Sequence, residues 1–488
     1  MKQLIIANDL KNLWREKLVT FVIAISLIFA VLAFYNGYQF SQSQLSVIDT
    51  AKQQQQTAID LAKQGLAARL NNNDAINWWD DVYDLRGQAF YLMINYATKQ
   101  PLATAPIATG QADVFPYYFR MLITEKQNIV QQYDYVNPLQ LLLGQFDLAF
   151  VIIYLLPLLI IGLSYNALSQ EQQSGQLRLL LLQGANPWVL LYSQLILRVL
   201  LVLLPFLIAA NSLLFFYSES YTVTDAVAFS TTVVVYCLFW SCLCGFIISR
   251  GKSAANNAAI LMTSWLSLVI IIPTTFNTIN LMANPTPSRL HYIDSLRSNT
   301  DAANKASEKT LAKFFSDHPE LAANNDGSSD YATKKIATII AIEKAMQPYD
   351  EQFAQATTTQ QQYAQNYKFL SPATIVYSAL VELAGNGLTR QHAYMSAVEQ
   401  HHQKLQHFFK TEIVKASQAG DFSPCNGCNA KPTLTDLATI PQFNMPTSTI
   451  PLAIWSLALL FLISFGLAII TKRRVTQIGL ADAQQVVV

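Results

Sequence analysis

The stretch SQEQQSGQLRLLLLQGANPWVLLYSQL, Ser169 to Leu195, decides how the rest of the chain is interpreted. Its pattern is typical of an amphipathic helix pair interrupted by glycines, and it joins two strongly apolar runs. The run before it covers Asn137 to Leu168, and the apolar sequence after it continues from Leu195 to Tyr217. We therefore expect a short surface segment between two membrane spans, placed to touch something at the membrane surface.

The composition indicates an integral membrane protein. Of the 488 residues, 52% are hydrophobic and only 13% are charged. The apolar share exceeds that of a soluble domain, and the charged share falls well short of it. The net charge of +1 provides no basic field, so we expect the lipid bilayer and no nucleic acid among the partners.

Apolar windows along the chain predict six membrane spans. Crossing roughly 30 Å of hydrocarbon takes about 20 apolar residues. The predicted spans cover residues 18–38, 147–168, 187–217, 225–249, 257–280 and 449–471. The first span follows a long charged stretch and lacks a clean small-x-small cleavage site, so we interpret it as an uncleaved anchor.

The positions of Lys and Arg predict the orientation. Basic residues precede the first span, flank the segments 169–186 and 250–256, and follow the last span in the tail 472–488. The connection 218–224 carries Glu219 but no Lys or Arg, as an external loop should. By the positive-inside rule both termini are cytoplasmic, and we expect a multi-pass protein of the bacterial cytoplasmic (inner) membrane.

This topology places two large segments, 39–146 and 281–448, outside the cytoplasm. The first has a helical pattern up to a turn at NNND, residues 71–74, and continues through NWWDDVYDLRGQAFYLMINYAT, residues 77–98. The second contains the break NNDGSSD, Asn324 to Asp330, with helical stretches at Tyr331–Met346 and Ala393–Ser417. The predicted fold is mainly α: six transmembrane helices with two largely helical extracytoplasmic domains.

The cytoplasmic segments are too short to hold a catalytic domain. The string GKS, Gly251 to Ser253, is not a phosphate-binding loop, because the glycine that the motif requires is replaced by Phe246 and no strand precedes it. We therefore expect a protein that is not an enzyme and has no motor of its own.

The segment 169–186 admits two interpretations. Glu171 falls near a helix start, where the helix dipole favours an anion, and Leu177, Leu180 and Leu181 form one apolar face. Such a helix can lie in the headgroup layer of the membrane, or it can dock on a partner.

The pattern of a span, E-x-x-S-G-x-L-R-L-L-L, a break of small residues and proline, and a second long span resembles the permeases of the type 2 ABC exporter class. The likeness extends over nearly the whole chain to a subgroup with large external domains catalogued as a domain of unknown function. The stretches that carry this likeness are NPLQLLLGQFDLAFVIIYLLPLLI, GQADVFPYY, SRGKSAANNAAILMTSWLSLVIIIPTTFN, PTPSRL and LSPATIVYSALVELAGNGLTRQHAY. Gln176 stands where the usual pattern carries Thr.

The resemblance implies that residues 169–186 are a coupling helix that docks on a separate ATP-binding subunit. It places in this element Glu171, Gly175, Leu177, Arg178 and Leu179. It also implies that residues 1–17, with Trp14 and Arg15, form an elbow helix along the inner leaflet. The implied partners are the ABC ATP-binding subunit and a second permease copy or sister permease. No cofactor is expected on this chain, since ATP and Mg belong to the partner ATPase.

Several residues inside the spans have two interpretations. Arg198 either snorkels to the interface or faces a polar partner in the translocation path. Pro157, Pro205 and Pro273 either kink their spans as hinges or serve local packing.

Five cysteines divide by predicted compartment. Cys237, Cys242 and Cys244 lie within a span and are expected to pack as small apolar side chains. Cys425 and Cys428 face an oxidising compartment on this topology, and we expect a local disulfide across the Asn-Gly turn between them. The alternative there is a metal site with His401, His402 and His407, whose spacing lacks the i, i+4 pair. We expect no metal.

Trp78, Trp79, Asp80 and Asp81 form an aromatic and acidic cluster, which we interpret as core tryptophans beside solvated aspartates; the alternative is a substrate contact. The sequence thus favours a permease for ATP-driven export. Two rival functions remain: mechanical transmission of ATP-driven motion to a periplasmic partner without solute transport, and a membrane enzyme with an external active site.

Overall fold

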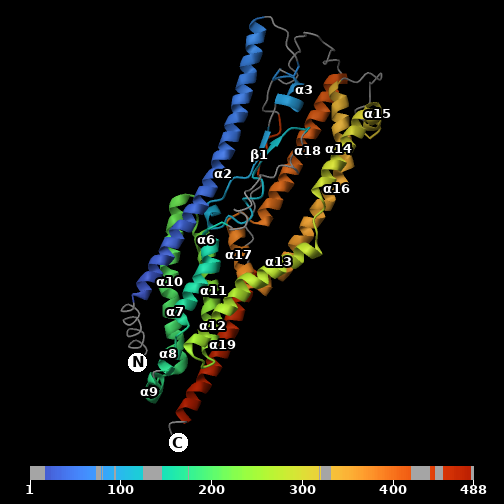
Figure 1. Ribbon diagram of the computed structural model, residues 1–488. Coiled ribbons are helices and arrows are strands. Elements are labelled where there is room, and N and C mark those ends of the chain that lie inside the picture. The colour runs from blue at the N-terminus through green and yellow to red at the C-terminus, as the bar shows by residue number, and fades with distance from the viewer. Residues whose placement is uncertain are drawn as a thin grey trace.

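The computed structural model describes residues 17–72, 78–79, 81–92, 95–124, 145–173, 175–317, 319, 331–418, 440–445 and 454–484. Most of this part of the chain is helical. Figure 1 shows a bundle of helices at the end that carries the C-terminus, and a second body beyond it that we call the distal domain. The distal domain comprises the far half of the first long helix and most described residues of 78–124, 289–418 and 440–445.

Five helices are long and apolar enough to cross a membrane. They correspond to five of the six predicted spans. They are α2 (Leu18–Asn71), α10 (Pro187–Tyr217), α11 (Val223–Ile248), the continuous helix formed by α12 (Ala254–Trp265), η4 (Leu266–Ile271) and α13 (Ile272–Ala283), and α19 (Ile454–Gln484).

The remaining predicted span, 147–168, corresponds to a shorter apolar helix. It consists of α6 (Leu148–Phe150), the π-helical turn η3 (Val151–Leu155) and α7 (Leu156–Ser164). At roughly 1.5 Å per residue this helix covers about 25 Å, less than the hydrocarbon thickness. Its side chains Leu156 and Ile160 are buried in the main core of the bundle. That this helix crosses the membrane therefore stays a prediction.

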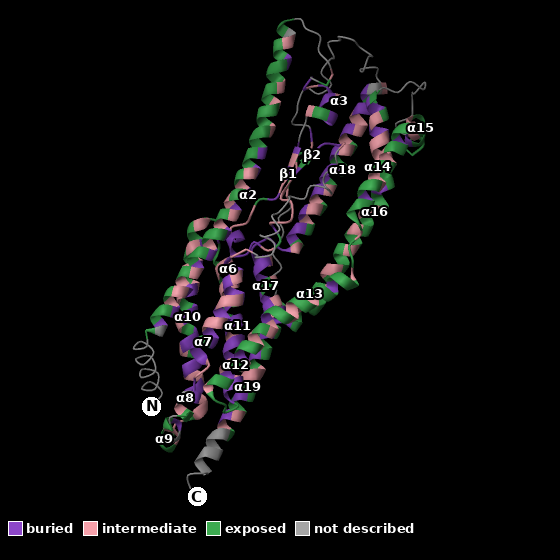
Figure 2. Cartoon of the chain, in the orientation of Figure 1, coloured by how far each residue is buried: buried purple, intermediate pink, exposed green. Residues whose placement is uncertain are grey.

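Helix α11 is the centre of the bundle. In its most apolar window 72% of the residues are buried, against 11% for the helix Ala254–Ala283. Figure 2 shows this contrast along the two helices. Phe229, Tyr236 and Trp240 on α11 are fully buried. Burying such large rings contributes several kcal/mol each in aqueous proteins, and in a bundle their shape fixes which helices can surround them.

Two of the three predicted proline kinks coincide with π-helical turns. Pro157 follows η3, and Pro273 follows η4. A proline has no N–H and its ring clashes with the carbonyl one turn earlier, so the helix widens and a carbonyl loses its partner. The Tyr236 hydroxyl donates to the carbonyl of Ile153, four residues before Pro157, at 3.0 Å.

At the second π-helical turn, too, a side-chain hydroxyl donates to a carbonyl that lacks a helical donor. In the π pattern each N–H bonds five residues back, so Pro273 leaves the carbonyl of Leu268 without a helical donor. The hydroxyl of Ser371, at the start of α17 (Pro372–Leu383), donates to that carbonyl. Pro205, by contrast, lies inside α10, which stays α-helical on both sides of it.

The predicted boundary between the first span and the first external domain is not a structural break. Helix α2 runs without interruption from Leu18 to Asn71, ending at the predicted NNND turn. The segment after it departs from the expected helix. A short helical stretch, α3 (Leu85–Gly87) and η1 (Gln88–Leu92), is followed by β1 (Asn95–Thr98), the turn η2 (Ala105–Ile107) and β2 (Tyr118–Met121).

The strands β1 and β2 pair antiparallel, with Asn95 opposite Met121. Along β1 buried and half-buried residues alternate, which is the period of a strand that is covered on one face. The predicted helix through Thr98 is therefore wrong for these residues, because pairing with a strand some twenty positions later overrides the local pattern.

The second part of the distal domain is helical, as predicted. It contains α14 (Arg289–Lys305), α15 (Ser307–Asp317), α16 (Tyr331–Tyr367), η6 (Lys368–Leu370), α17 and α18 (Leu388–Gln418). Both predicted helices are confirmed within α16 and α18, while the predicted break at 324–330 lies outside the described residues. Tyr394 joins the helices to the sheet, since its ring stacks on Phe119 at 5.8 Å and its hydroxyl donates to the carbonyl of Ala97 at 2.8 Å.

Replacing Tyr236 by Phe should destabilise the bundle by about 1–3 kcal/mol, because a buried carbonyl loses its donor. In a Pro157→Ala background the same change should cost much less, since the restored N–H of residue 157 can bond within the helix. Thermal unfolding of the purified chain in detergent measures both. An equal cost of Tyr236→Phe in the two backgrounds would contradict this explanation of the π turn.

Candidate functional site

The predicted surface segment is a pair of short helices at the end of the bundle opposite the distal domain (Figure 1). Helix α8 (Ser169–Gln173) and helix α9 (Gln176–Leu182) are separated by Gly175 at φ 74°, in the left-handed region that favours glycine. Nothing lies within 4 Å of a Cβ placed on Gly175, so a side chain would fit there. The positive φ of the backbone is therefore what favours glycine at this position. We call residues 169–182 the α8–α9 segment.

The predicted apolar face of α9 is confirmed. Leu177 is buried in the main core, and Leu180 and Leu181 pack against it. The neighbouring Leu179 and Leu182 are 62% and 61% exposed. The α8–α9 segment therefore presents two leucines outward while its other leucines anchor it to the bundle.

Two polar side chains of α10 hold the turn that leads into α8. The Gln194 amide accepts from the backbone N–H of Leu168 at 3.2 Å and donates to the Glu171 carboxylate at 2.6 Å. The Arg198 guanidinium, one helical turn further along α10, donates to the carbonyl of Leu163 at 2.7 Å and to the Asn166 side chain at 3.1 Å. These bonds supply partners that the end of α7 cannot obtain from its own helix.

Leu168 makes this support necessary. Its φ is 58°, the one positive value of a non-glycine residue in the described chain. A leucine in the left-handed region costs of order 1–2 kcal/mol and persists only where neighbours hold it. Its side chain is buried and its N–H is bonded to Gln194.

A third polar side chain ties the segment to α12. The Asn257 amide, which is fully buried, donates to the Ser169 hydroxyl at 2.8 Å and to the carbonyl of Lys252 at 3.3 Å. We call Gln194, Arg198 and Asn257 the polar clamp. Through Gln194 and Asn257 it joins the α8–α9 segment to the two long helices α10 and α12.

The structure gives Arg198 partners within the protein. Its side chain is buried and bonded to a carbonyl and an amide at the end of α7, while its position relative to the membrane interface, and with it snorkelling, stays a prediction. A cation at a helix C-terminus is also favoured by the helix dipole. Arg198 therefore bonds groups at the C-terminal end of α7.

The other predicted residues are placed as follows. The backbone of Arg178 belongs to α9, but its side chain lies outside the described part of the structure. Trp14, Arg15, Asp80, Cys425 and Cys428 also lie outside the described residues. Cys237, Cys242 and Cys244 are buried as free thiols in α11, as expected of packing residues.

Of the histidines considered as metal ligands, His402 lies near one acid, with its Nε2 3.8 Å from the Glu343 carboxylate. Among the residues that the structure describes, no group of three or more His, Cys, Asp or Glu side chains could hold a metal ion. His401 and His402 are buried in α18, whereas His407 is exposed. The His401 ring lies edge-on to Phe443, and burial lowers the pKa of His401 to about 4, so the imidazole is neutral.

The Trp78 cluster is a packing feature. The Trp78 ring contacts the rings of Tyr91 and Tyr331, and Arg86 lies over it at 5.2 Å. The expectation of a core position is wrong for Trp79, whose side chain is 46% exposed. The expectation of a solvated Asp81 is wrong, because its carboxylate is buried and accepts from the N–H of Tyr83 at 2.9 Å. Burial raises the pKa of Asp81.

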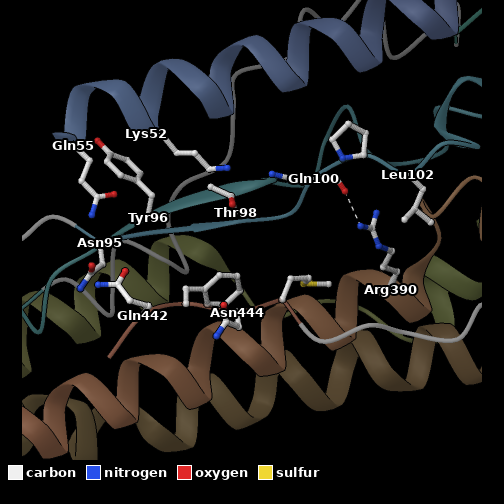
Figure 3. Close-up of a pocket in the computed structure, with 13 residues that line it drawn as sticks. Lys52, Gln55, Asn95, Tyr96, Thr98, Gln100, Leu102, Arg390, Gln442 and Asn444 are labelled. Atoms are coloured by element: carbon white, nitrogen blue, oxygen red, sulfur yellow. Dashed lines mark hydrogen bonds between the residues drawn. The ribbon is translucent and has the colours of Figure 1, made fainter. Parts of the chain in front are cut away.

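The distal domain contains a polar cavity of about 660 Å³ between α2, β1, α18 and residues 442–445 (Figure 3). Its charged lining residues, within the described chain, are Lys52 and Arg390. The Arg390 guanidinium donates to the carbonyl of Gln100 at 2.6 Å, the bond drawn in Figure 3, and thereby fixes the end of β1. Such a lining suits a ligand rich in hydrogen-bond acceptors.

Lys99 lies behind this cavity and is buried. Its ammonium donates to the Gln391 side chain and lies over the Tyr394 ring at 5.9 Å. Burial, together with the charge of Arg390, lowers the pKa of Lys99 to about 7. Near neutral pH this group therefore carries only part of a charge.

Sequence patterns alone could have drawn attention to the clamp. Gln194, Arg198 and Asn257 are polar residues inside or beside apolar runs, where each needs a protein partner. Only Arg198 among them was considered from the sequence alone. The sequence does not indicate which segment a single amide side chain, such as that of Gln194 or Asn257, bonds.

Comparison with known proteins gives one match. Residues 289–423 match the model of a domain of unknown function, DUF3526. The matched range covers α14 to α18 and lies inside the second predicted external domain. No curated protein and no solved structure matches the chain.

Replacing Gln194 by Leu should loosen the α7–α8 turn, because the Leu168 N–H and the Glu171 carboxylate both lose their bond to Gln194. Hydrogen exchange of backbone amides in residues 165–173 should become at least tenfold faster. Ser193→Ala is the matched control, since the Ser193 hydroxyl bonds only a carbonyl of its own helix. Unchanged protection in Gln194→Leu would show that the clamp does not hold the turn.

Lys99 should make stability depend on pH. Its pKa is lower in the folded than in the unfolded protein, so the unfolded chain binds more protons between about pH 7 and 10 and stability rises with pH there. The contribution from pH 7 to 9 is on the order of 2 kcal/mol. Lys99→Met should remove this rise in unfolding temperature; a variant that keeps the full rise would contradict the assignment.

Proposed function

We propose that this chain is the membrane permease subunit of an ABC transporter of the type 2 exporter class. It would work in ATP-driven export, with ATP and Mg bound by a separate ATP-binding subunit. All six apolar segments cross the membrane in this proposal, with both termini on the side of the ATPase and the distal domain on the other. The matched domain of unknown function then lies on the outer side.

The observation that carries the proposal is the form of the α8–α9 segment. It protrudes from one end of the bundle, exposes Leu179 and Leu182, and is bonded through the polar clamp to α10 and α12. A helix that merely lay in the headgroup layer would need an apolar face toward lipid, but no buried bonds to two long helices. Exposed leucines on a segment that is firmly held suit docking on a protein partner.

The mechanism follows from these connections. Closure of two ATP-binding subunits on ATP would displace the α8–α9 segments of a pair of permease chains. The polar clamp would pass this displacement to α10 and α12, and the two packings of the bundle would alternate access between the two membrane faces. The distal domain would receive the substrate or gate its exit.

A second candidate function is mechanical transmission to a partner without solute transport. The continuous helix α2 favours it, because its 54 residues reach from the bundle into the distal domain. At roughly 1.5 Å per residue such a helix is about 80 Å long and can carry motion as a rod. Transport of a solute into sealed vesicles by the reconstituted complex would distinguish the exporter from this alternative.

The docking surface can be tested with the double change Leu179→Asn and Leu182→Asn. These side chains are exposed, so the fold should be kept while co-purification with a co-expressed ATP-binding subunit falls at least tenfold. Leu61→Asn is the matched control, since Leu61 on α2 is also 62% exposed. Full recovery of the complex with both leucines replaced would refute docking at this segment.

A further inference from the structure

A second cavity, of about 630 Å³, lies where the bundle meets the distal domain. Its walls come from the start of the helix Leu148–Ser164, from η4 and α13, from α17 and from the loop 110–114. A volume of this size is in the range of small-molecule sites. The function proposed above does not account for it.

The charged side chains that line this cavity, within the described residues, are all acidic. Asp113 and Asp147 line it, and none of the described lining residues is Lys, Arg or His. The Asp147 carboxylate is held in place by the backbone N–H groups of Thr109 and Phe150, both at 2.8 Å. These bonds fix the carboxylate in the wall of the cavity, where its negative charge attracts a cation.

Aromatic rings form another part of the wall. Phe150, Tyr154 and Tyr377 line the cavity, and the rings of Phe150 and Tyr154 lie 4.8 Å apart. The face of an aromatic ring attracts a cation through its quadrupole, and the ring also offers apolar contact. Rings and carboxylates together, without a competing basic side chain, are the chemistry that recognises organic cations.

The walls also include both π-helical breaks. Tyr154 belongs to η3, while Val269 of η4 and Pro273 beside it line the opposite part. π-helical turns occur frequently at functional sites, because they direct side chains away from the regular helical path. A ligand here would contact the bundle at its two points of irregular backbone.

We propose that this cavity binds an organic cation that carries apolar groups around its charge, such as a quaternary ammonium or phosphonium compound. The carboxylates of Asp113 and Asp147 balance the charge, and the rings cover the apolar groups. That the bound cation is the exported substrate rests on the function proposed above; the binding itself does not.

Binding is tested on the full chain alone, purified in detergent, without nucleotide or an ATP-binding subunit. Tetraphenylphosphonium is the probe, and tetraphenylborate, of the same shape and opposite charge, controls for partition into the micelle. Calorimetry should show saturable binding of one phosphonium ion per chain and no saturable binding of the borate. Binding of both ions alike, or of neither, would overturn the proposal.

Variants locate the site. Asp113→Asn should weaken phosphonium binding about tenfold, and Phe150→Leu should weaken it without any change of charge. Asp301→Asn, the same change at an exposed position on α14, should have no effect. Unchanged affinity in both cavity variants would overturn the assignment. Because no ATPase is present, this result does not depend on docking. If replacement of Leu179 and Leu182 leaves complex formation unchanged but the phosphonium ion still binds, the binding site stands and only its role in export is removed.

Discussion

The turn between α7 and α8 depends on hydrogen bonds that its own backbone cannot provide. Gln194 and Arg198 stand one helical turn apart on α10, so their side chains reach the N–H of Leu168 and the carbonyl of Leu163 from the same side. In an apolar bundle an unpaired backbone group costs several kcal/mol, because no water replaces the missing partner. The direction in which the chain leaves the bundle, and with it the position of the α8–α9 segment, follows from these two side chains.

The same principle holds at two prolines inside the bundle. Pro157 and Pro273 each leave a carbonyl without a helical donor, and Tyr236 and Ser371 supply hydroxyl groups in their place. Ser371 comes from the segment that leads into α17, so one of these bonds joins the bundle to the distal domain. Irregular backbone in the bundle is thus held by side chains of neighbouring elements.

The regular helices could be predicted from the sequence because their signals are local. Apolar length identified the long helices, and the spacing of Leu177, Leu180 and Leu181 identified the buried face of α9. The strand β1 could not be predicted in this way, since Asn95 to Thr98 become a strand only by pairing with Tyr118 to Met121. The burial of Asp81 could not be predicted for a related reason. An acidic residue beside a turn is expected to be solvated, and the Tyr83 N–H from which its carboxylate accepts is known only from the structure.

For the candidate site, the sequence indicated which segment matters but not what holds it. The resemblance places Glu171 in the docking element, and the structure adds that its carboxylate accepts from the Gln194 amide inside the protein; its part in docking stays a prediction. Asn257 and Gln194 carried no sign of their partners, which lie 88 and 26 positions away in the chain. Hydrogen bonds between distant segments depend on how the helices pack against one another. Local sequence patterns do not show which helices pack together.

In the proposed mechanism, the α8–α9 segment and the start of α10 move as one body. It is tested most directly by distances between spin labels at the exposed positions Gln183, Ile196 and Met282 in the complex with the ATP-binding subunit, measured with and without trapped ATP. We expect the distance from Gln183 to Ile196 to stay constant while the distance from Ile196 to Met282 changes. A change in the distance from Gln183 to Ile196 would contradict movement as one body.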